Sequence, residues 1–241
     1  MLQTWRELLF MHWPVPREVI QKRIPEDLVV DTHEGQAWIG LVPFAMEGIR
    51  HPSIPAIPGL RAMLELNVRT YVHFRGEPGV WFFSLDASHR PMVEGARRLY
   101  HLPYFKARMD CRRQGPQITY ASRRTHGGAP AAEMTAEWEV AEERPESDPR
   151  SLNFFLTERY CLYTAHRRRL FQGRIHHPPW PLRQARLINL RSNLVESHGI
   201  ALPDSQPLLH HADILHVEIF ALKAVARLRD KRRWRVGQMQ K

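Results

Sequence analysis

Residues 66–86, LNVRTYVHFRGEPGVWFFSLD, predict two β-strands joined by a tight turn. In the first half, apolar and β-branched residues alternate with polar ones at a period of two, which is the side-chain period of a strand. The second half is rich in Val, Trp and Phe, and it follows directly after RGEPG, whose glycines and proline favour a turn. We therefore expect residues 66–86 to form a β-hairpin.

Strand patterns recur along most of the chain. Met134, Ala136, Trp138 and Val140 alternate with threonine and glutamates, which predicts a half-buried strand with a charged outer face. Further strands are expected at residues 36–44, 103–111, 117–124, 160–166, 168–175, 185–191 and 213–222. Helices are expected at residues 16–24, at residues 90–100 and in a segment with Asp148 as its N-cap.

Many strands and few helices favour a mainly β (α+β) fold, with an antiparallel barrel or strongly curved sheet and helices on its flank. Two proline-rich stretches, residues 51–59 and 141–149, are predicted to be loops and not domain linkers, because the strands on both sides are short and need partners. A chain of 241 residues can still form one domain. We assign residues 1–226 to a single domain and residues 227–241 to a basic tail.

The net charge of +10 is concentrated in this tail, where seven Lys or Arg residues stand against one Asp. Such a segment could bind nucleic acid or another acidic partner through its cations, although most basic runs are simply solvated. The amino terminus lacks the charged and apolar regions of a signal peptide, and no stretch of 18 apolar residues occurs. We expect a cytoplasmic protein without a membrane span.

The sequence contains no motif typical of a metal or cofactor site. The two cysteines lie far apart, and no CxxC, GxGxxG or GxxxxGK[ST] pattern occurs. His211 and Asp213 would share a strand face, as metal ligands sometimes do, but no third ligand stands at a telling spacing. Ser84 and Asp86 also share a face, without a GxSxG motif or an identifiable histidine partner. We therefore predict no metal and no cofactor.

Two predicted strands carry a polar stripe on one face. The members of these stripes are Glu65, Asn67, Arg69 and Tyr71 on the first strand, and Tyr104, Lys106 and Arg108 on the second. Such stripes either face water or line a polar cavity, in which Arg69 or Arg108 could hold a carboxylate ligand with paired N–H donors. Asn67 and Tyr71 favour the cavity, because they are less typical of a solvated strand than Lys or Glu.

A family resemblance extends over roughly residues 5–222. The stretches that carry it are HWPVPREVIQKRIPEDLVVDTHEGQAWIGLVPF, ELNVRTYV, PGVWFFSLDA, ARRLYHLPYFKARM, FLTERYCLY and HHPPWPL. In these stretches the chain resembles the YqjF-like family of uncharacterised bacterial proteins, a branch of the acetoacetate decarboxylase-like superfamily. The resemblance implies a curved antiparallel sheet closed into a barrel-like cone around a buried pocket, and a homo-oligomer would be in keeping with the superfamily.

The resemblance also implies site residues. Acetoacetate decarboxylases use a lysine that forms a Schiff base, activated by an adjacent lysine, with an arginine and a glutamate in the pocket. WRELL resembles the segment of the arginine and makes Arg6 the candidate, while LELNVRTYV makes Glu65 the candidate glutamate. Pro103 matches a proline before the lysine pair, so the pair falls on Tyr104 and Phe105. A phenol cannot form an imine, and we do not expect acetoacetate decarboxylase activity.

The leading hypothesis is thus a protein whose cavity holds a small organic acid or similar polar ligand, without the Schiff-base lysine at the family position. The candidate ligand-binding residues are Arg6, Glu65, Arg69, Tyr71, Tyr104 and Arg108. Tyr104, Glu65 and Lys106 are the candidate catalytic residues, although catalysis itself is left open. In a second hypothesis Lys106, two residues beyond Tyr104 on the same strand face, has taken over as the imine-forming nucleophile of a decarboxylase or aldol-type enzyme. In a third, the tail binds nucleic acid or an acidic partner.

Overall fold

The computed structural model describes residues 1–50, 62–145 and 147–229. The predicted loop at residues 51–59 and the tail from residue 230 onward lie outside the described residues. The body of the fold continues past residue 226, because Arg227 pairs with Arg169 in a sheet and Leu228 is buried.

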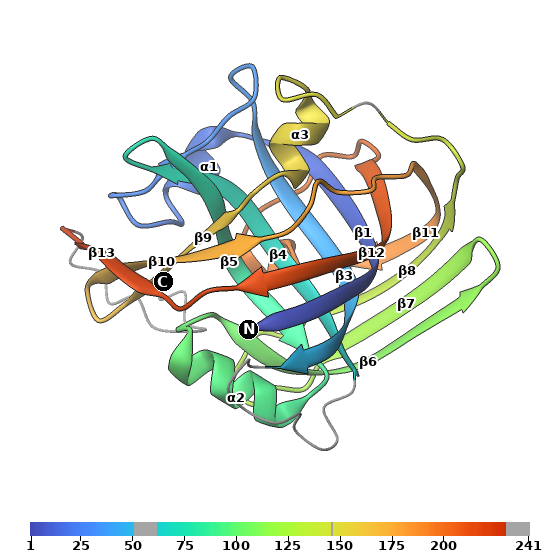
Figure 1. Cartoon of the computed structure of the whole chain (residues 1–241), viewed down its shortest axis with the longest axis horizontal. Helices are drawn as coiled ribbons and strands as arrows, with labels where there is room; N and C mark the ends of the chain where they lie inside the picture. The colour runs from blue at the N-terminus through green and yellow to red at the C-terminus, as the bar shows by residue number, and fades with distance from the viewer. Residues whose placement is uncertain (51–61, 146, 230–241) are drawn as a thin grey trace.

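Strands dominate the molecule, as predicted, and a set of them closes into a ring (Figure 1). The ring follows the order β5, β9, β10, β12, β1, β3, β4, and β4 pairs back to β5. Its members are β1 (Leu2–Val15), β3 (Ala37–Arg50), β4 (Ala62–Phe74), β5 (Glu77–Ala87), β9 (Cys161–His166), β10 (Arg169–His176) and β12 (Leu208–Ile219). The ring surrounds an interior that side chains from all of these strands can reach.

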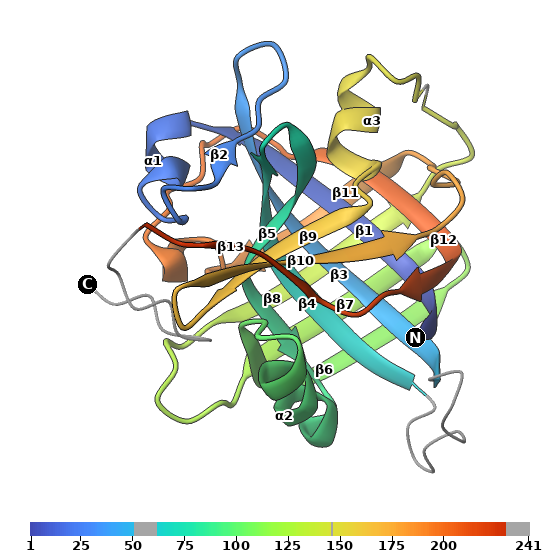
Figure 2. The same ribbon diagram turned by 60° about the vertical axis from the view of Figure 1, so that its left-hand side comes forward.

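A second group of strands extends from β5 and packs outside the ring (Figure 2). It consists of β6 (Tyr104–Gln114), β7 (Gln117–Arg124), β8 (Glu133–Val140) and β11 (Ala185–Ser192), while β2 (Val29–Val30) pairs with β4 and β13 (Lys223–Arg227) with β10. Most pairings are antiparallel, but β5 pairs in parallel with β6 at one end and with β9 at the other. The predicted curved, mainly antiparallel sheet is confirmed, and the two short parallel pairings occur at β5, where the chain crosses over before it returns.

The predicted hairpin is confirmed as β4 and β5, which pair from Phe74 and Glu77 at the turn to Glu65 and Ala87, with one register shift between Val68 and Arg69. The turn consists of Arg75 and Gly76 alone, with φ values of 52° and 83°. Two consecutive positive φ angles are typical of a type I′ turn, whose twist matches that of the flanking strands. Gly76 supplies the left-handed conformation without steric cost.

Three α-helices lie at the two ends of the ring in the described part of the chain: α1 (Arg17–Gln21), α2 (Arg90–Leu99) and α3 (Leu152–Thr157). Figures 1 and 2 show α2 at the end where β1 begins, and α1 and α3 at the opposite end. Asp148 is not the N-cap of α3, because Ser151 holds that position and its Oγ accepts from the Phe154 N–H at 3.1 Å. Asp148 instead accepts the Arg150 N–H in the preceding turn. No helix of the described residues is long and apolar enough to cross a membrane.

Strands buried on both faces are the ones that sequence periodicity located poorly. In β1, residues 8–11 are all buried, so the run LLFM shows no alternation of apolar and polar residues. β12 begins at Leu208, five residues before the predicted start, because it pairs with β1 as far as His12. In β8, by contrast, the alternating burial around Trp138 confirms the predicted half-buried strand.

Candidate functional site

A cavity of about 350 Å³ lies inside the ring and reaches from α3 to α2. Every strand of the ring contributes to its wall. The apolar lining includes Met1, Trp5, Leu8, Val42, Phe44, Met46, Ile49, Met63, Val80, Phe82, Leu85, Met92, Leu99, Leu102, Leu162, Ile175, Trp180 and Ile219. The polar side chains of the wall are Gln3, Arg50, Glu65, Asn67, Arg69, Tyr100, Tyr104, Thr157, Arg159, Cys161 and His177. A mostly apolar chamber with a few polar groups is typical of a small-molecule site.

The polar stripe of β4 faces this cavity and not bulk water. Glu65, Asn67 and Arg69 are 3%, 4% and 9% exposed, and all three line the cavity. The opposite face of β4 is also covered, with Val68 in the core beneath β7 and β8. Of the two orientations that the sequence allowed for this stripe, the cavity-facing one is therefore present.

Tyr71, the fourth member of the stripe, is buried beneath the cavity and is not one of its lining residues. Its hydroxyl donates to the Leu156 carbonyl at 2.7 Å and lies 2.6 Å from Nε2 of His12. Burial, aided by Arg69, holds the pKa of His12 well below its usual range, so this histidine is neutral. Tyr71 thus joins the end of β4 to α3.

Glu65 and Tyr104 form a hydrogen-bonded pair in the cavity wall. The Tyr104 hydroxyl donates to Oε2 of Glu65 at 2.7 Å. Burial raises the pKa of Glu65 to about 7, although hydrogen bonds from Tyr104 and Asn67 oppose the rise. Burial, together with the Glu65 charge, raises the pKa of Tyr104 well above its usual range. A carboxyl that is half protonated near neutral pH can both give and take a proton.

Arg69 carries a buried positive charge without a carboxylate beside it. Its Nη2 donates to the Leu156 carbonyl at 3.1 Å and, at 3.4 Å, to the Tyr71 hydroxyl. Its Nε has no hydrogen-bond partner, and it forms no ion pair with any described residue. The neighbouring Arg159 differs, because its Nη1 is 2.7 Å from Oδ2 of Asp31. A buried guanidinium with free donors is suited to an anionic ligand.

Gly40 on β3 makes room for this arginine. It is the register partner of Arg69, and a Cβ at this position would lie 3.0 Å from the His12 ring and 3.4 Å from the Arg69 side chain. A larger residue would push both side chains away from their present places. The local sequence IGL of β3 therefore helps to set the position of the guanidinium.

Three more lining side chains have polar atoms without partners among the described residues. Nδ1 of His177 donates to the Pro178 carbonyl at 2.8 Å, so Nδ1 carries the proton and Nε2 is free to accept. The indole N–H of Trp180 and Oδ1 of Asn67 also lack partners among the described residues. Neither His177 nor Trp180 was among the site residues predicted from the sequence, although both lie in HHPPWPL, one of the stretches that carry the family resemblance.

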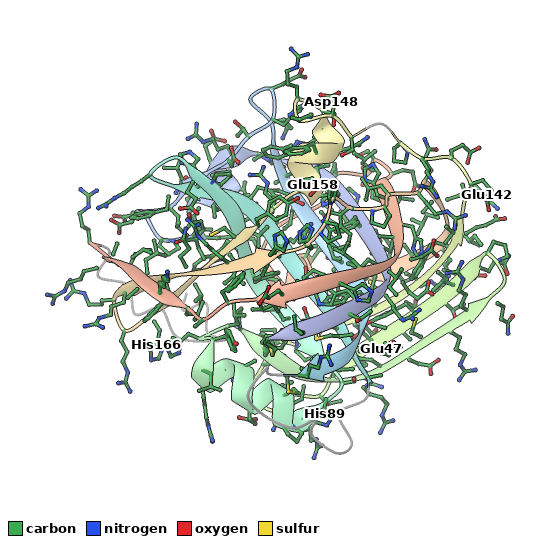
Figure 3. The ribbon with its side chains drawn as sticks, viewed as in Figure 1. Glu47, His89, Glu142, Asp148, Glu158 and His166 are labelled. Carbon is green, nitrogen blue, oxygen red and sulfur yellow. The ribbon has the colours of Figure 1, made fainter. Side chains whose placement is uncertain are left out.

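Three of the residues singled out in the sequence lie away from the cavity wall. Nε of Arg6 is 2.9 Å from Oε2 of Glu47, which is labelled in Figure 3, and the Arg6 side chain is 44% exposed. Nζ of Lys106 lies 2.9 Å from Oε1 of Glu94 on α2. Arg108 is exposed. Of the predicted ligand-binding residues, the structure brings Glu65, Arg69 and Tyr104 together around the cavity, with Tyr71 behind them.

Arg6 points away from the cavity because of a bulge in β1. The pairing between β1 and β3 shifts register between Arg6 and Met11, and Glu7 has a φ of 52°. An extra residue in one strand changes which side chains face inward. Periodicity could not locate this bulge, since no glycine or proline marks it.

Ser84 has a histidine partner that the sequence did not identify. Nε2 of His198 lies 3.0 Å from the Ser84 hydroxyl, and burial lowers the pKa of His198 to about 3. Asp86 pairs with Arg124, at 2.8 Å between Oδ1 and Nε, and not with the histidine. None of the four lines the cavity. The group lacks the acid–histidine contact of a catalytic triad and acts as buried packing between β5 and β7.

A second charged group lies outside the cavity wall, where β1, β6 and β12 meet. We call Glu7, Arg113, Arg183, His211 and Asp213 the outer charge cluster. Nη1 of Arg113 donates to both carboxylate oxygens of Glu7, at 3.0 and 2.9 Å, and to Asp213 at 2.7 Å. Nη1 of Arg183 donates to the other oxygen of Asp213 at 3.0 Å. Although partial burial opposes it, these hydrogen bonds lower the pKa of Asp213 to about 2.

Ligand atoms of Glu7, His211 and Asp213 lie within 4.8 Å of one another, as in a metal site. The proton on His211, however, is placed so that the ring does not suit a metal ion. The Trp138 indole N–H points to Nδ1 of His211 at 3.4 Å, so the proton is on Nε2, which faces Asp213 at 3.3 Å. A metal would need the lone pair of this Nε2, and the two carboxylates already bind arginine. The arrangement is that of an ion-pair network.

Comparison with known proteins places this chain among uncharacterized relatives. The family described as an uncharacterized conserved protein, DUF2071, matches residues 2–216. The uncharacterized protein YqjF of Bacillus subtilis (strain 168) is 45% identical over 212 residues, which cover 88% of this chain and 87% of YqjF. Neither description names an activity.

Solved structures show where the fold occurs. Acetoacetate decarboxylase from Legionella pneumophila superposes with a TM-score of 0.63 at 12% identity, covering 94% of this chain and 87% of that chain. An acetoacetate decarboxylase-like enzyme from Sphingomonas wittichii RW1 gives 0.63 at 12%, covering 94% of each chain. The enduracididine biosynthesis enzyme MppR complexed with pyruvate gives 0.62 at 12%, covering 94% and 90%. The fold is therefore acetoacetate decarboxylase-like, as expected, and at this identity the likeness extends to the fold alone.

Proposed function

Since the chain belongs to the DUF2071 family of uncharacterized conserved proteins, we propose its function from the cavity: it binds a small organic acid inside the ring of strands. Arg69 holds the carboxylate, and the Glu65–Tyr104 pair contacts the ligand further along the wall. The acid is bound without a covalent imine. If Glu65 also transfers a proton to or from the bound acid, the protein is an enzyme. If Glu65 does not, the protein only binds the acid.

The observation that carries this proposal is the uncompensated charge of Arg69. A buried ion without a partner is costly, and that cost is relieved when a counter-ion enters. Phe10 lies beneath the guanidinium, 5.2 Å from ring centroid to Cζ, which fixes the orientation of its plane. Arg69 lines the cavity, and a carboxylate there could accept hydrogen bonds from the guanidinium N–H groups that Leu156 and Tyr71 do not occupy. One structural neighbour holds pyruvate, which is itself a small organic acid.

The Glu65–Tyr104 pair supports proton exchange with such a ligand. Glu65 reaches its midpoint of ionisation near pH 7, and Tyr104 keeps its proton throughout the physiological range. In the strand, Glu65 lies four residues from Arg69, or about 13 Å between Cα atoms. A ligand held by Arg69 would therefore present its body, and not its carboxylate, to Glu65.

No lysine of the described residues lines this wall, so a side-chain amine for imine formation is missing from it. Lys22, Lys106 and Lys223 are the lysines of the described residues, and none of them lines the cavity. The position that the resemblance gives to the reactive lysine holds Tyr104. A non-covalent mode of binding is consistent with these placements.

Binding of organic acids can be tested directly, because Trp5 and Trp180 line the cavity and their fluorescence should report a ligand. Titration with butyrate and 2-oxobutyrate should quench or shift this emission, whereas butyramide of the same size should not. Equal binding of butyramide and butyrate would contradict the role of Arg69. A Trp180→Phe variant identifies which indole reports the ligand.

The alternative, an enzyme that uses Lys106 as nucleophile, has a separate test. Borohydride reduction in the presence of 2-oxobutyrate or pyruvate, followed by peptide mass spectrometry, should give no adduct on Lys106. The ion pair of Lys106 with Glu94 keeps the amine on the outer side of α2. An adduct that disappears in Lys106→Ala would replace the non-covalent proposal by imine chemistry.

A further inference from the structure

The cavity wall changes from charged to apolar along its length, and the residues of β4 show over what distance. Its inward residues run from Arg69 past Asn67 and Glu65 to Met63, about 20 Å between the first and last Cα. Arg69 contacts the Leu156 carbonyl of α3, so the charged end lies toward α3. Met63 belongs to the apolar cluster against which Met92 of α2 packs, and both line the cavity, so the other end lies toward α2.

Beyond Glu65 the lining is mainly apolar and dominated by flexible or aromatic side chains, with Gln3, Arg50 and Tyr100 as its polar members. Met46 is the register partner of Met63, and Phe44 is that of Glu65. Trp5 lies across from them, with its ring centroid 5.3 Å from that of Phe44. Methionine fills irregular space and adapts to different apolar shapes, which makes it common at sites for varied apolar ligands.

We propose that the ligand is a carboxylic acid with a large apolar tail, an aryl or medium-chain alkyl group, and that the chamber beneath α2 selects this tail. This inference rests on the proposed function, because the carboxylate is anchored at Arg69. A cavity of about 350 Å³ is within the size range that holds drug-sized ligands. An acid of three or four carbons would leave most of the apolar wall uncovered.

The position of the cavity opening also places the carboxylate at Arg69 and the tail beneath α2. Leu99, at the end of α2, lines the cavity and is 73% exposed, so the chamber meets solvent beside this helix. An acid would enter carboxylate first and travel past Met63 and Glu65 to Arg69, and its tail would be the last part to enter. An exposed leucine at this entrance is consistent with a ligand whose last part to enter is apolar.

A chain-length series tests the inference. Butyrate, hexanoate, octanoate and phenylpropionate are titrated against the full chain, with tryptophan fluorescence as the readout and concentrations kept below micelle formation. Burial of each added methylene should tighten binding about fourfold until the chamber is full. Octanol and octanamide serve as tails without a carboxylate and should bind much more weakly than octanoate.

The outcomes separate the inference from the proposed function. If butyrate binds as tightly as octanoate, or binds alone, the tail chamber is wrong while the acid site stands. If octanol binds as tightly as octanoate, the chamber stands and the Arg69 anchor is wrong. If no acid of the series binds, both are overturned.

Two substitutions on α2 locate the tail. Ala96 lines the cavity, whereas Arg98 on the same helix is exposed and does not. Ala96→Phe should reduce octanoate binding at least tenfold and leave butyrate unchanged, because the new ring fills the tail chamber. Arg98→Phe is the matched control and should change neither. If Ala96→Phe does not fold, Met92→Ala enlarges the same region and should move the optimum to a longer acid; an unchanged optimum would overturn the inference.

Discussion

We call the polar stripe of β4, with Glu65, Asn67, Arg69 and Tyr71, the cavity stripe. The cavity stripe and the outer charge cluster both contain carboxylates and arginines, and they differ in how completely these groups are paired. In the outer charge cluster, Glu7 and Asp213 each receive hydrogen bonds from Arg113. In the cavity stripe, neither the Arg69 guanidinium has a carboxylate partner nor Oδ1 of Asn67 a hydrogen-bond donor among the residues that the structure describes. Both groups are partly or fully removed from water, so the difference lies in pairing and not in composition.

Paired and unpaired charges have different consequences for a protein. A completed network stabilises the fold and leaves little for a ligand to gain. An unpaired buried group lowers stability, and a ligand that supplies the missing partner recovers the loss. The comparison therefore assigns binding to the cavity stripe and cohesion of β1, β6 and β12 to the outer charge cluster.

The largest expected effect concerns Glu65 and pH. Its folded pKa of about 7 lies above the ordinary value of 4.5, so its contribution to stability is complete below pH 4.5 and is lost as pH rises through 7. Relative to Glu65→Gln, the free energy of unfolding of the parent should fall by roughly 3 kcal/mol over this range. Urea denaturation of both proteins at several pH values measures the difference.

Other groups with shifted pKa values, such as His211 and Asp86, contribute to both proteins and largely cancel in this difference. Parallel stability curves for the parent and Glu65→Gln would show that Glu65 titrates normally. In that case the cavity stripe would carry no ionisation cost, and the contrast with the outer charge cluster would be lost for this residue.

Arg69→Met is expected to weaken binding of octanoate by about 50-fold, because two charge-assisted hydrogen bonds to the carboxylate are removed. The free energy of unfolding should stay the same or rise, since an unpaired buried charge disappears. The Leu156 carbonyl keeps the Tyr71 hydroxyl as donor. Calorimetric titration and urea denaturation give the two values. Lower stability with unchanged binding would make Arg69 a structural residue.

Arg113→Met should have the opposite pattern. It removes the donor shared by Glu7 and Asp213, and because these groups are partly exposed we expect a loss of about 1–2 kcal/mol in unfolding free energy. Binding of octanoate should not change. Arg112, whose exposed side chain pairs with the exposed Asp110, offers a neighbouring control: Arg112→Met should leave both quantities unaltered. Weaker binding in Arg113→Met would connect the two regions.

Sequence reasoning located the cavity stripe because β4 is one regular strand. A period of two placed Glu65, Asn67 and Arg69 on one face, and neither a bulge nor a register change interrupts the pattern between them on the β3 side. The carboxylate at Glu65 also matched the family resemblance. Regular local geometry was sufficient for this part of the site.

The remaining features depend on contacts between distant segments. Glu7 and Arg113 are 106 residues apart, and Ser84 and His198 are 114 apart, so no spacing rule could pair them. The bulge at Glu7 directs Arg6 outward, and Lys106 forms an ion pair with Glu94 of α2. Periodicity predicts which face a side chain takes within a strand, but the partner on that face is decided by the tertiary fold.

The smallest expected effect is that of metal ions on the outer charge cluster. Zn²⁺ present at 100 times its dissociation constant would add about 2.7 kcal/mol of stability and raise the midpoint of thermal unfolding by several degrees. We expect no shift, because Arg113 and Arg183 occupy the carboxylates and the protonated Nε2 of His211 faces them. The same scan on Arg113→Met tests whether Arg113 is the reason. A rise of the unfolding midpoint that appears only in this variant would show that removing Arg113 frees the carboxylates for the metal. A shift in the parent would mean that its pairing is not complete, and the contrast with the cavity stripe would then rest on Arg69 alone.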